Sequence, residues 1–229
     1  MNAKGVLISV MCIALVVMLA GAGTLAYFSD TETSTGNTFA AGTLDLKIRD
    51  DNESWGDGVT ATWTLDNMLP GDSKYGYVKV DKVGSIDADH LEITCDYIVT
   101  EENPQTESDT DPNTHLHPDW MAKNMTVTFA QYDNSGEFNL LTGEKIEGGK
   151  VVEQHDYWKI EDVDTDGRQT LYDLKYGNGG NGIDNLPAPN GEQYTFRMRV
   201  KFNETAGNDF QGDTFNLTMI FTLNQDSSQ

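Results

Sequence analysis

Strict alternation of apolar and polar side chains is the feature that most limits how this 229-residue chain can fold. The alternation is clearest near the C-terminus. There the apolar positions of two segments are Tyr194, Phe196, Met198, Val200 and Phe202, and then Phe215, Leu217, Met219, Phe221 and Leu223. A period of two indicates β-strands with one face buried and one face in water.

Shorter segments at 44–48, 59–65, 78–80, 91–97 and 125–129 repeat this alternation, the last with Met125, Val127 and Phe129 on one side. Turn signals rich in Gly, Asn and Asp separate the segments, which predicts an all-β, antiparallel β-sandwich. Two polar segments, 101–118 and 162–190, are predicted as a surface loop and a long insertion. Residues 120–123 and 170–176 could each form a helical turn or two, and we expect one domain over residues 42–229.

The N-terminus has the features of a targeting signal. An unbroken apolar run from Val6 to Leu19 is followed by small residues, and Thr24-Leu25-Ala26 has the small-x-small form that a signal peptidase recognises. The run is short for a membrane span, which needs about 20 residues. We therefore predict a signal helix over 1–26, cleaved between Ala26 and Tyr27, and a secreted product with no stable membrane anchor.

Two alternatives for the N-terminus stay open. The apolar run could remain as an anchor. Lys4-Gly5 before an apolar run also resembles the cleavage site of type IV prepilins, and in a type IV pilin the helix would be retained.

The chain is strongly acidic, with 37 Asp and Glu residues against 15 Lys and Arg and a formal net charge of -22. This charge excludes nucleic acid as a partner and favours cations. Of two cysteines, Cys12 lies in the predicted signal, so the exported chain has no internal disulfide. We expect Cys95 to be a small buried apolar residue, with an intermolecular disulfide as the alternative.

Residues 162–173 match the spacing of an EF-hand calcium loop, D-x-D-x-D-G. Calcium needs several hard oxygen ligands around one point, and glycine permits the sharp turn that gathers them. The predicted ligands of a Ca2+ ion are Asp162, Asp164, Asp166, Arg168 through its carbonyl, Thr170 and Asp173. Aspartate in place of glutamate at the last position departs from the EF-hand pattern, and an acidic solvated turn is the alternative.

Four N-x-S/T sequons are candidate N-glycosylation sites in an exported protein, at Asn52, Asn124, Asn203 and Asn216. His115 and His117 lie near Asp119, but the sequence has no H-E-x-x-H motif, and we expect exposed histidines instead of a zinc site. Neither a Ser/His/Asp or Cys/His arrangement nor a phosphate-binding glycine loop is evident. We therefore expect no enzymatic activity.

Several segments resemble the TasA/camelysin family of biofilm matrix fibre proteins, which has archaeal relatives that form bundling pili. The segments are GTLAYFSD at residues 23–30, FAAGTLDL at 39–46, the turn NMLPGD at 67–72 and the closing strand at 213–223. The resemblance is strong over the first third of the chain and the last strand, and weak between them.

The resemblance implies a jelly-roll-like sandwich released by a dedicated signal peptidase and assembled head to tail into a homo-oligomeric filament. Residues 27–41 would then be a segment that adds as a strand to the neighbouring subunit, with Phe28 as an anchor. Its predicted donor-strand residues are Tyr27, Phe28, Asp30, Thr31, Thr33 and Thr35. Because camelysins are also classed as metallopeptidases, a cell-surface metallopeptidase is the alternative function.

Overall fold

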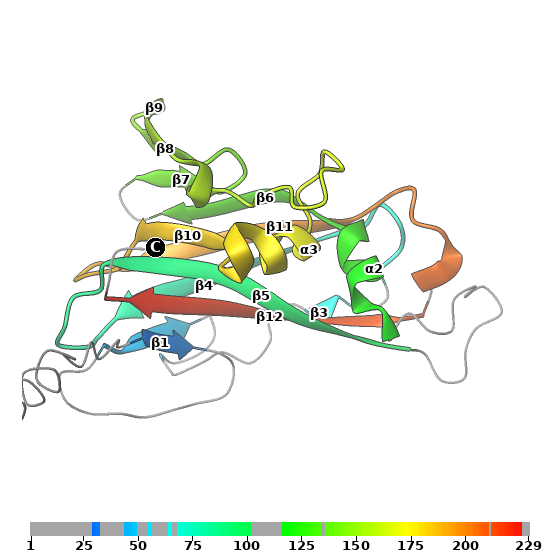
Figure 1. Cartoon of the computed structure of the whole chain (residues 1–229), viewed down its shortest axis with the longest axis horizontal. Helices are drawn as coiled ribbons and strands as arrows, with labels where there is room; N and C mark the ends of the chain where they lie inside the picture. Colours follow the sequence, from blue (N-terminus) through cyan, green and yellow to red (C-terminus); the bar gives the residue numbers. More distant parts are fainter. Residues whose placement is uncertain are drawn as a thin grey trace, which may run out of the picture.

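The computed structural model describes residues 29–32, 44–49, 55, 64–65, 68–101, 116–133, 136–210 and 212–225. Their strands form two antiparallel sheets that pack into a sandwich, as predicted (Figure 1). The predicted signal helix and the cleavage site lie outside the described residues. Among the described helices, none combines the length and the apolar character that crossing a membrane requires.

The first sheet has the order β1-β12-β5-β10, and the short β3 also pairs with β12. The second has the order β2-β4-β11-β6-β7-β8-β9. The first sheet's strands are β1 (Ser29–Glu32), β3 (Thr64–Leu65), β5 (His90–Thr100), β10 (Ile183–Pro187) and β12 (Thr214–Asn224). The second sheet's strands are β2 (Leu46–Arg49), β4 (Ser73–Lys82), β6 (Met125–Asp133), β7 (Glu137–Asn139), β8 (Glu144–Glu147), β9 (Lys150–Gln154) and β11 (Tyr194–Phe202).

Apolar side chains from the two sheets meet in one core. Phe196 of β11 and Phe221 of β12 contact each other edge to face, with ring centroids 5.5 Å apart, and both are fully buried. The alternation over 194–202 and 215–223 therefore predicted the inner faces of β11 and β12 correctly.

Helices are few and short among the described residues. The predicted helical turns are present as α2 (Pro118–Asn124) and α3 (Leu171–Tyr176), which lie against β5 (Figure 1). Single 3-10 turns are η2 (Asp156–Trp158), η3 (Gly177–Gly180) and η4 (Asn208–Phe210).

The prediction that Phe129 faces inward with Met125 and Val127 was wrong. A register shift between β6 and β11 falls at this point, because Val127 pairs with Val200 but Phe129 pairs with Arg199. An extra residue reverses the alternation. The buried positions of β6 are accordingly Met125, Val127, Ala130 and Tyr132, while Phe129 contacts the ring of Tyr75 on β4.

The prediction of one long insertion over 162–190 also needs correction. This stretch contains α3, η3 and the sheet strand β10. Ile183 and Leu186 of β10 are both fully buried although they lie three residues apart. The strand therefore lacks the period of two by which the others were recognised.

Candidate functional site

One edge of the first sheet is formed by β1, which overlaps the segment predicted as a donor strand. Its four residues pair antiparallel with the end of β12, from Ser29 opposite Asn224 to Glu32 opposite Phe221. Asp30 and Thr31 therefore lie within a strand of the sheet. The other predicted donor-strand residues, Tyr27, Phe28, Thr33 and Thr35, lie outside the described part of the chain.

The two edge strands β1 and β2 follow each other in sequence but belong to different sheets (Figure 1). Only residues 33–45 join them, because β1 ends at Glu32 and β2 begins at Leu46. An extended chain of that length spans up to about 45 Å. In the chain, β1 is thus joined to the rest of the sandwich through this link alone.

The acidic loop before α3 brings three of the predicted calcium ligands together. Carboxylate oxygens of Asp162, Asp164 and Asp166 lie within 4.8 Å of one another. Asp162 accepts hydrogen bonds from the backbone N–H groups of Asp166 and Gly167, at 3.1 and 2.9 Å. The loop is thus closed by its own first aspartate, as in a cation-binding turn.

Two basic side chains already contact this acidic cluster. The Lys123 ammonium lies 2.9 Å from Asp164, and this hydrogen bond raises the pKa of Lys123. The Arg168 side chain is hydrogen-bonded to the Asp166 carboxylate. A calcium ion would have to compete with both cations for these oxygens.

Of the three remaining predicted ligands, Thr170 and Asp173 lie at the start of α3, and Arg168 lies between them and the loop. Thr170 is the N-cap of α3, and the Asp173 carboxylate accepts hydrogen bonds from the Thr170 backbone and hydroxyl at 2.8 and 2.7 Å. A third hydrogen bond comes from the Val163 backbone at 2.9 Å. Burial raises the pKa of Asp173, although these hydrogen bonds act in the opposite direction. Asp173 therefore links the loop to the helix, as a capping box does.

His117 and Asp119 do not point to one metal. The His117 ring stacks on Trp120 with centroids 4.5 Å apart. The Asp119 carboxylate accepts a hydrogen bond from the Tyr97 hydroxyl at 2.6 Å, and Tyr176 donates to it at 3.3 Å. His115 lies outside the described residues.

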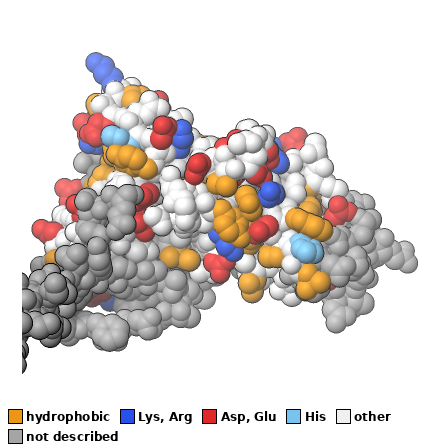
Figure 2. Space-filling view, viewed as in Figure 1, with side chains coloured by type: hydrophobic (Ala, Val, Ile, Leu, Met, Phe, Trp, Pro, Cys, Tyr) orange, Lys and Arg blue, Asp and Glu red, His pale blue; other side chains and the backbone are white. Residues whose placement is uncertain are grey.

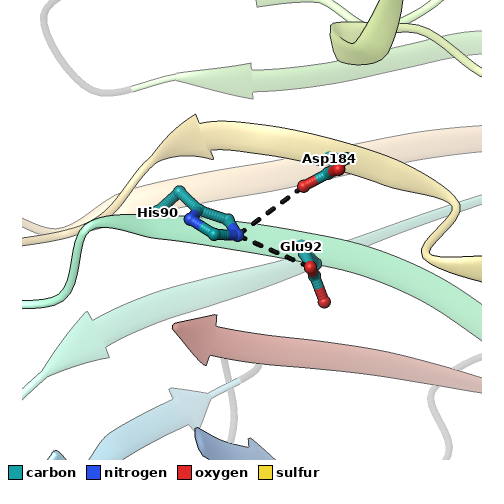
Figure 3. Close-up of side chains that lie close together, drawn as sticks. All are labelled: His90, Glu92 and Asp184. Carbon is teal, nitrogen blue, oxygen red and sulfur yellow. Dashed lines mark hydrogen bonds and ion pairs between the residues drawn. The ribbon is translucent and has the colours of Figure 1, made fainter. Parts of the chain in front are cut away.

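A different histidine, His90, lies among carboxylates. Its Nε2 atom is 3.5 Å from Glu92 Oε1 and 3.6 Å from Asp184 Oδ1 (Figure 3). The His90 side chain is 4% exposed and that of Asp184 is 9% exposed. Two of its three members, His90 and Glu92, lie two residues apart on one face of β5, whereas Asp184 comes from β10.

Three of the four sequons lie in the described residues. Asn124, Asn203 and Asn216 are all half-buried, and Asn52 lies outside. The Asn203 side chain donates to Asn124 Oδ1 at 3.4 Å and accepts from the Thr205 hydroxyl at 3.1 Å. A glycan on Asn203 would be attached to the nitrogen that donates this hydrogen bond.

Cys95 is buried, as expected, at 2% exposure. Its thiol donates to the Leu171 carbonyl at 3.5 Å, and burial raises its pKa. Such a thiol is inert at neutral pH. An intermolecular disulfide through Cys95 is incompatible with this position.

A comparison with protein families gives one match, which spans nearly the whole chain. Residues 3–229 match the family described as camelysin metallo-endopeptidase. No curated protein matches the chain.

Proposed function

The chain belongs to the TasA/camelysin family, and we propose that it is the structural subunit of an extracellular filament, a biofilm matrix fibre or bundling pilus. The observation that carries the proposal is β1, a four-residue edge strand on β12 joined to the rest of the fold through residues 33–45. The same antiparallel pairing with β12 can form within one subunit or between two.

Exchange between subunits has a low energetic cost, because the backbone hydrogen bonds broken inside one subunit are remade in the next. The contact joins different surfaces of the two subunits, so it repeats without closing and grows a filament. It also covers the edge of β12, which would otherwise present unpaired backbone groups.

A cysteine pair across β1 and β12 tests the exchange. Thr31 lies directly opposite Thr222, and facing residues of antiparallel strands have Cα atoms about 4.5–5.5 Å apart, within reach of a disulfide. In the exported protein carrying Thr31→Cys and Thr222→Cys, we expect a ladder of covalent multimers on non-reducing electrophoresis that collapses on reduction.

The matched control combines Thr31→Cys with Thr218→Cys, which is on the same strand but opposite Asp96 and four residues out of register with β1. It should give no ladder. Cross-linked monomers alone in the Thr222 variant would contradict the exchange. So would fibres, seen by electron microscopy, from a chain lacking residues 27–38.

We propose calcium binding at residues 162–166 as a feature of the same subunit. The support is the cluster of three aspartates and the turn that Asp162 closes. A bound ion would neutralise part of the acidic surface and hold the loop against α3.

A second candidate function is proteolysis at the cell surface, which the description of the matching family favours. Casein cleavage abolished by a chelator would support it. Sequencing of the secreted protein separates the pilin alternative, because a subunit released by signal peptidase starts at Tyr27 and a processed prepilin starts at Val6.

A further inference from the structure

The start of β5 holds a buried histidine whose surroundings are suited to a metal ion. His90 Nε2, Glu92 Oε1 and Asp184 Oδ1 all lie within 4.8 Å of one another and come from the adjacent strands β5 and β10 (Figure 3). This cluster is separate from the acidic loop and from the pairing of β1.

With the Asn224 amide in its present orientation, the hydrogen bonds of His90 leave Nε2 as the nitrogen without a proton. The Asn224 amide nitrogen lies 3.2 Å from Nε2, and an amide N–H only donates, so Nε2 is the acceptor. The proton is then on Nδ1, which donates to Asp89 Oδ2 at 3.2 Å. A carboxylate on the far nitrogen is the usual outer partner of a metal-binding histidine.

The distances match a metal site better than hydrogen bonds. Charged N–H···O bonds measure about 2.7–2.9 Å, whereas Nε2 is 3.5 and 3.6 Å from the two carboxylates. A single N–H also cannot be directed at both. The edge of a tetrahedron with zinc–ligand bonds of about 2.0–2.2 Å is about 3.3–3.6 Å, close to the observed separations.

The position of Asp184 is built by the backbone of β10. Ile183 pairs with Ile93 and Leu186 with Leu91, so the two residues between them face the single residue Glu92 in a β-bulge. Asn185 has a left-handed φ of 57°, and its carbonyl accepts a hydrogen bond from the Trp158 indole at 2.8 Å. Bulges of this kind redirect a side chain, here toward His90.

Charge also favours a cation. Three carboxylates, of Asp89, Glu92 and Asp184, lie around the buried His90 imidazole, and the Glu92 and Asp184 side chains are only 18% and 9% exposed. Crowding negative charges at low exposure is costly unless a positive charge offsets them. One imidazole and two carboxylates suit zinc or cobalt, whereas calcium and magnesium prefer oxygen ligands only.

We propose that His90, Glu92 and Asp184 bind one divalent transition-metal ion of the zinc class. The ion ties the bulge of β10 to the start of β5. Metal binding displaces the Asn224 amide N–H from Nε2. Asn224 of β12 pairs with both His90 and Ser29, so a single strand, β12, lies between the metal site and β1.

Calorimetry on the full chain, stripped with EDTA and titrated with ZnCl2, tests this site. We expect one equivalent to bind, a rise in the melting temperature, and visible absorption of a four- or five-coordinate ion when CoCl2 replaces zinc. Glu92→Gln and Asp184→Asn each should weaken zinc binding by at least about tenfold, the loss that even outer-shell changes cause.

Two controls should bind zinc as the wild type does. His117→Gln removes another described imidazole, and Asp162→Asn with Asp164→Asn disables the acidic loop. Circular dichroism shows whether each variant is folded, and Glu92→Gln changes only a half-buried side chain of equal size. If the wild type released no heat on titration with zinc and gave no visible absorption with cobalt, the proposed site would be wrong. Unchanged affinity in folded Glu92→Gln would also contradict it.

Discussion

At residue 182, just before β10, the backbone passes so close to β5 and α3 that only glycine fits. A Cβ there would lie 2.4 Å from the Ile93 carbonyl oxygen and 2.7 Å from that of Leu174. Its backbone N–H also donates to the Gly177 carbonyl at 2.9 Å. Gly182 thereby brings the end of α3 and the start of β10 against β5, and so sets the position of Asp184.

Gly182→Ala should strongly destabilise the fold, because the methyl group would overlap two backbone carbonyls. Gly179→Ala is the matched control, since Gly179 has nearly the same φ, 71° against 70°, with nothing within 4 Å of an added Cβ. We expect urea unfolding to show that Gly182→Ala costs at least about 2 kcal/mol more than Gly179→Ala. Equal losses would mean that backbone conformation alone, and no close contact, requires glycine at 182.

At the scale of the element, calcium would compete with two basic side chains for the aspartates of the loop at 162–166. Lys123 from α2 holds Asp164, and Arg168 holds Asp166. We expect weak calcium binding, with Kd of about 10⁻⁴–10⁻³ M as in extracellular modules, measured by calorimetry. Lys123→Gln should tighten it by removing a competing charge, and Asp164→Ala with Asp166→Ala should abolish it.

Lys175→Gln is the control for the lysine change. It removes an ion pair, 2.7 Å long, between α3 and Asp96 of β5 and should leave calcium affinity unaltered. A wild-type chain that gives no heat with calcium would exclude the site.

For the whole molecule, the net charge of -22 acts on every step of folding and assembly. Figure 2 shows acidic side chains spread over the visible face with basic ones between them. Like charges at this density repel one another and destabilise the compact state, and salt screens them over a Debye length that falls from about 30 Å at 0.01 M to about 8 Å at 0.15 M.

Raising NaCl over that range at pH 7 should therefore raise the melting temperature. A gain of about 1 kcal/mol corresponds to about 2–4 °C for a chain of this size. Near pH 4, where about half of the carboxylates are protonated, the same salt step should have much less effect. A salt response of equal size at both pH values, measured by calorimetric scanning, would show that screening of net charge is not its cause.

The local sequence determined which segments form the long strands β5, β11 and β12, and it identified Val78 and Val80 within β4. One face of each is buried, and burial on one face of an extended chain imposes a period of two on neighbouring residues. The aspartate cluster at 162–166 was likewise predictable, because its members lie within one turn. The cap formed by Thr170 and Asp173 explains why the predicted calcium ligands separate into two groups.

Only the tertiary structure decided the bulges and the sites that depend on partners far apart in the chain. The shift in β6 turned Phe129 outward, and the bulge in β10 hid that strand from a search for alternation. His90 and Asp184 meet because β5 and β10 are neighbours in the sheet, and β1 lies on β12, at the other end of the sequence. Pairing of distant strands is selected by the total packing of the sandwich, a quantity that no short stretch of sequence contains.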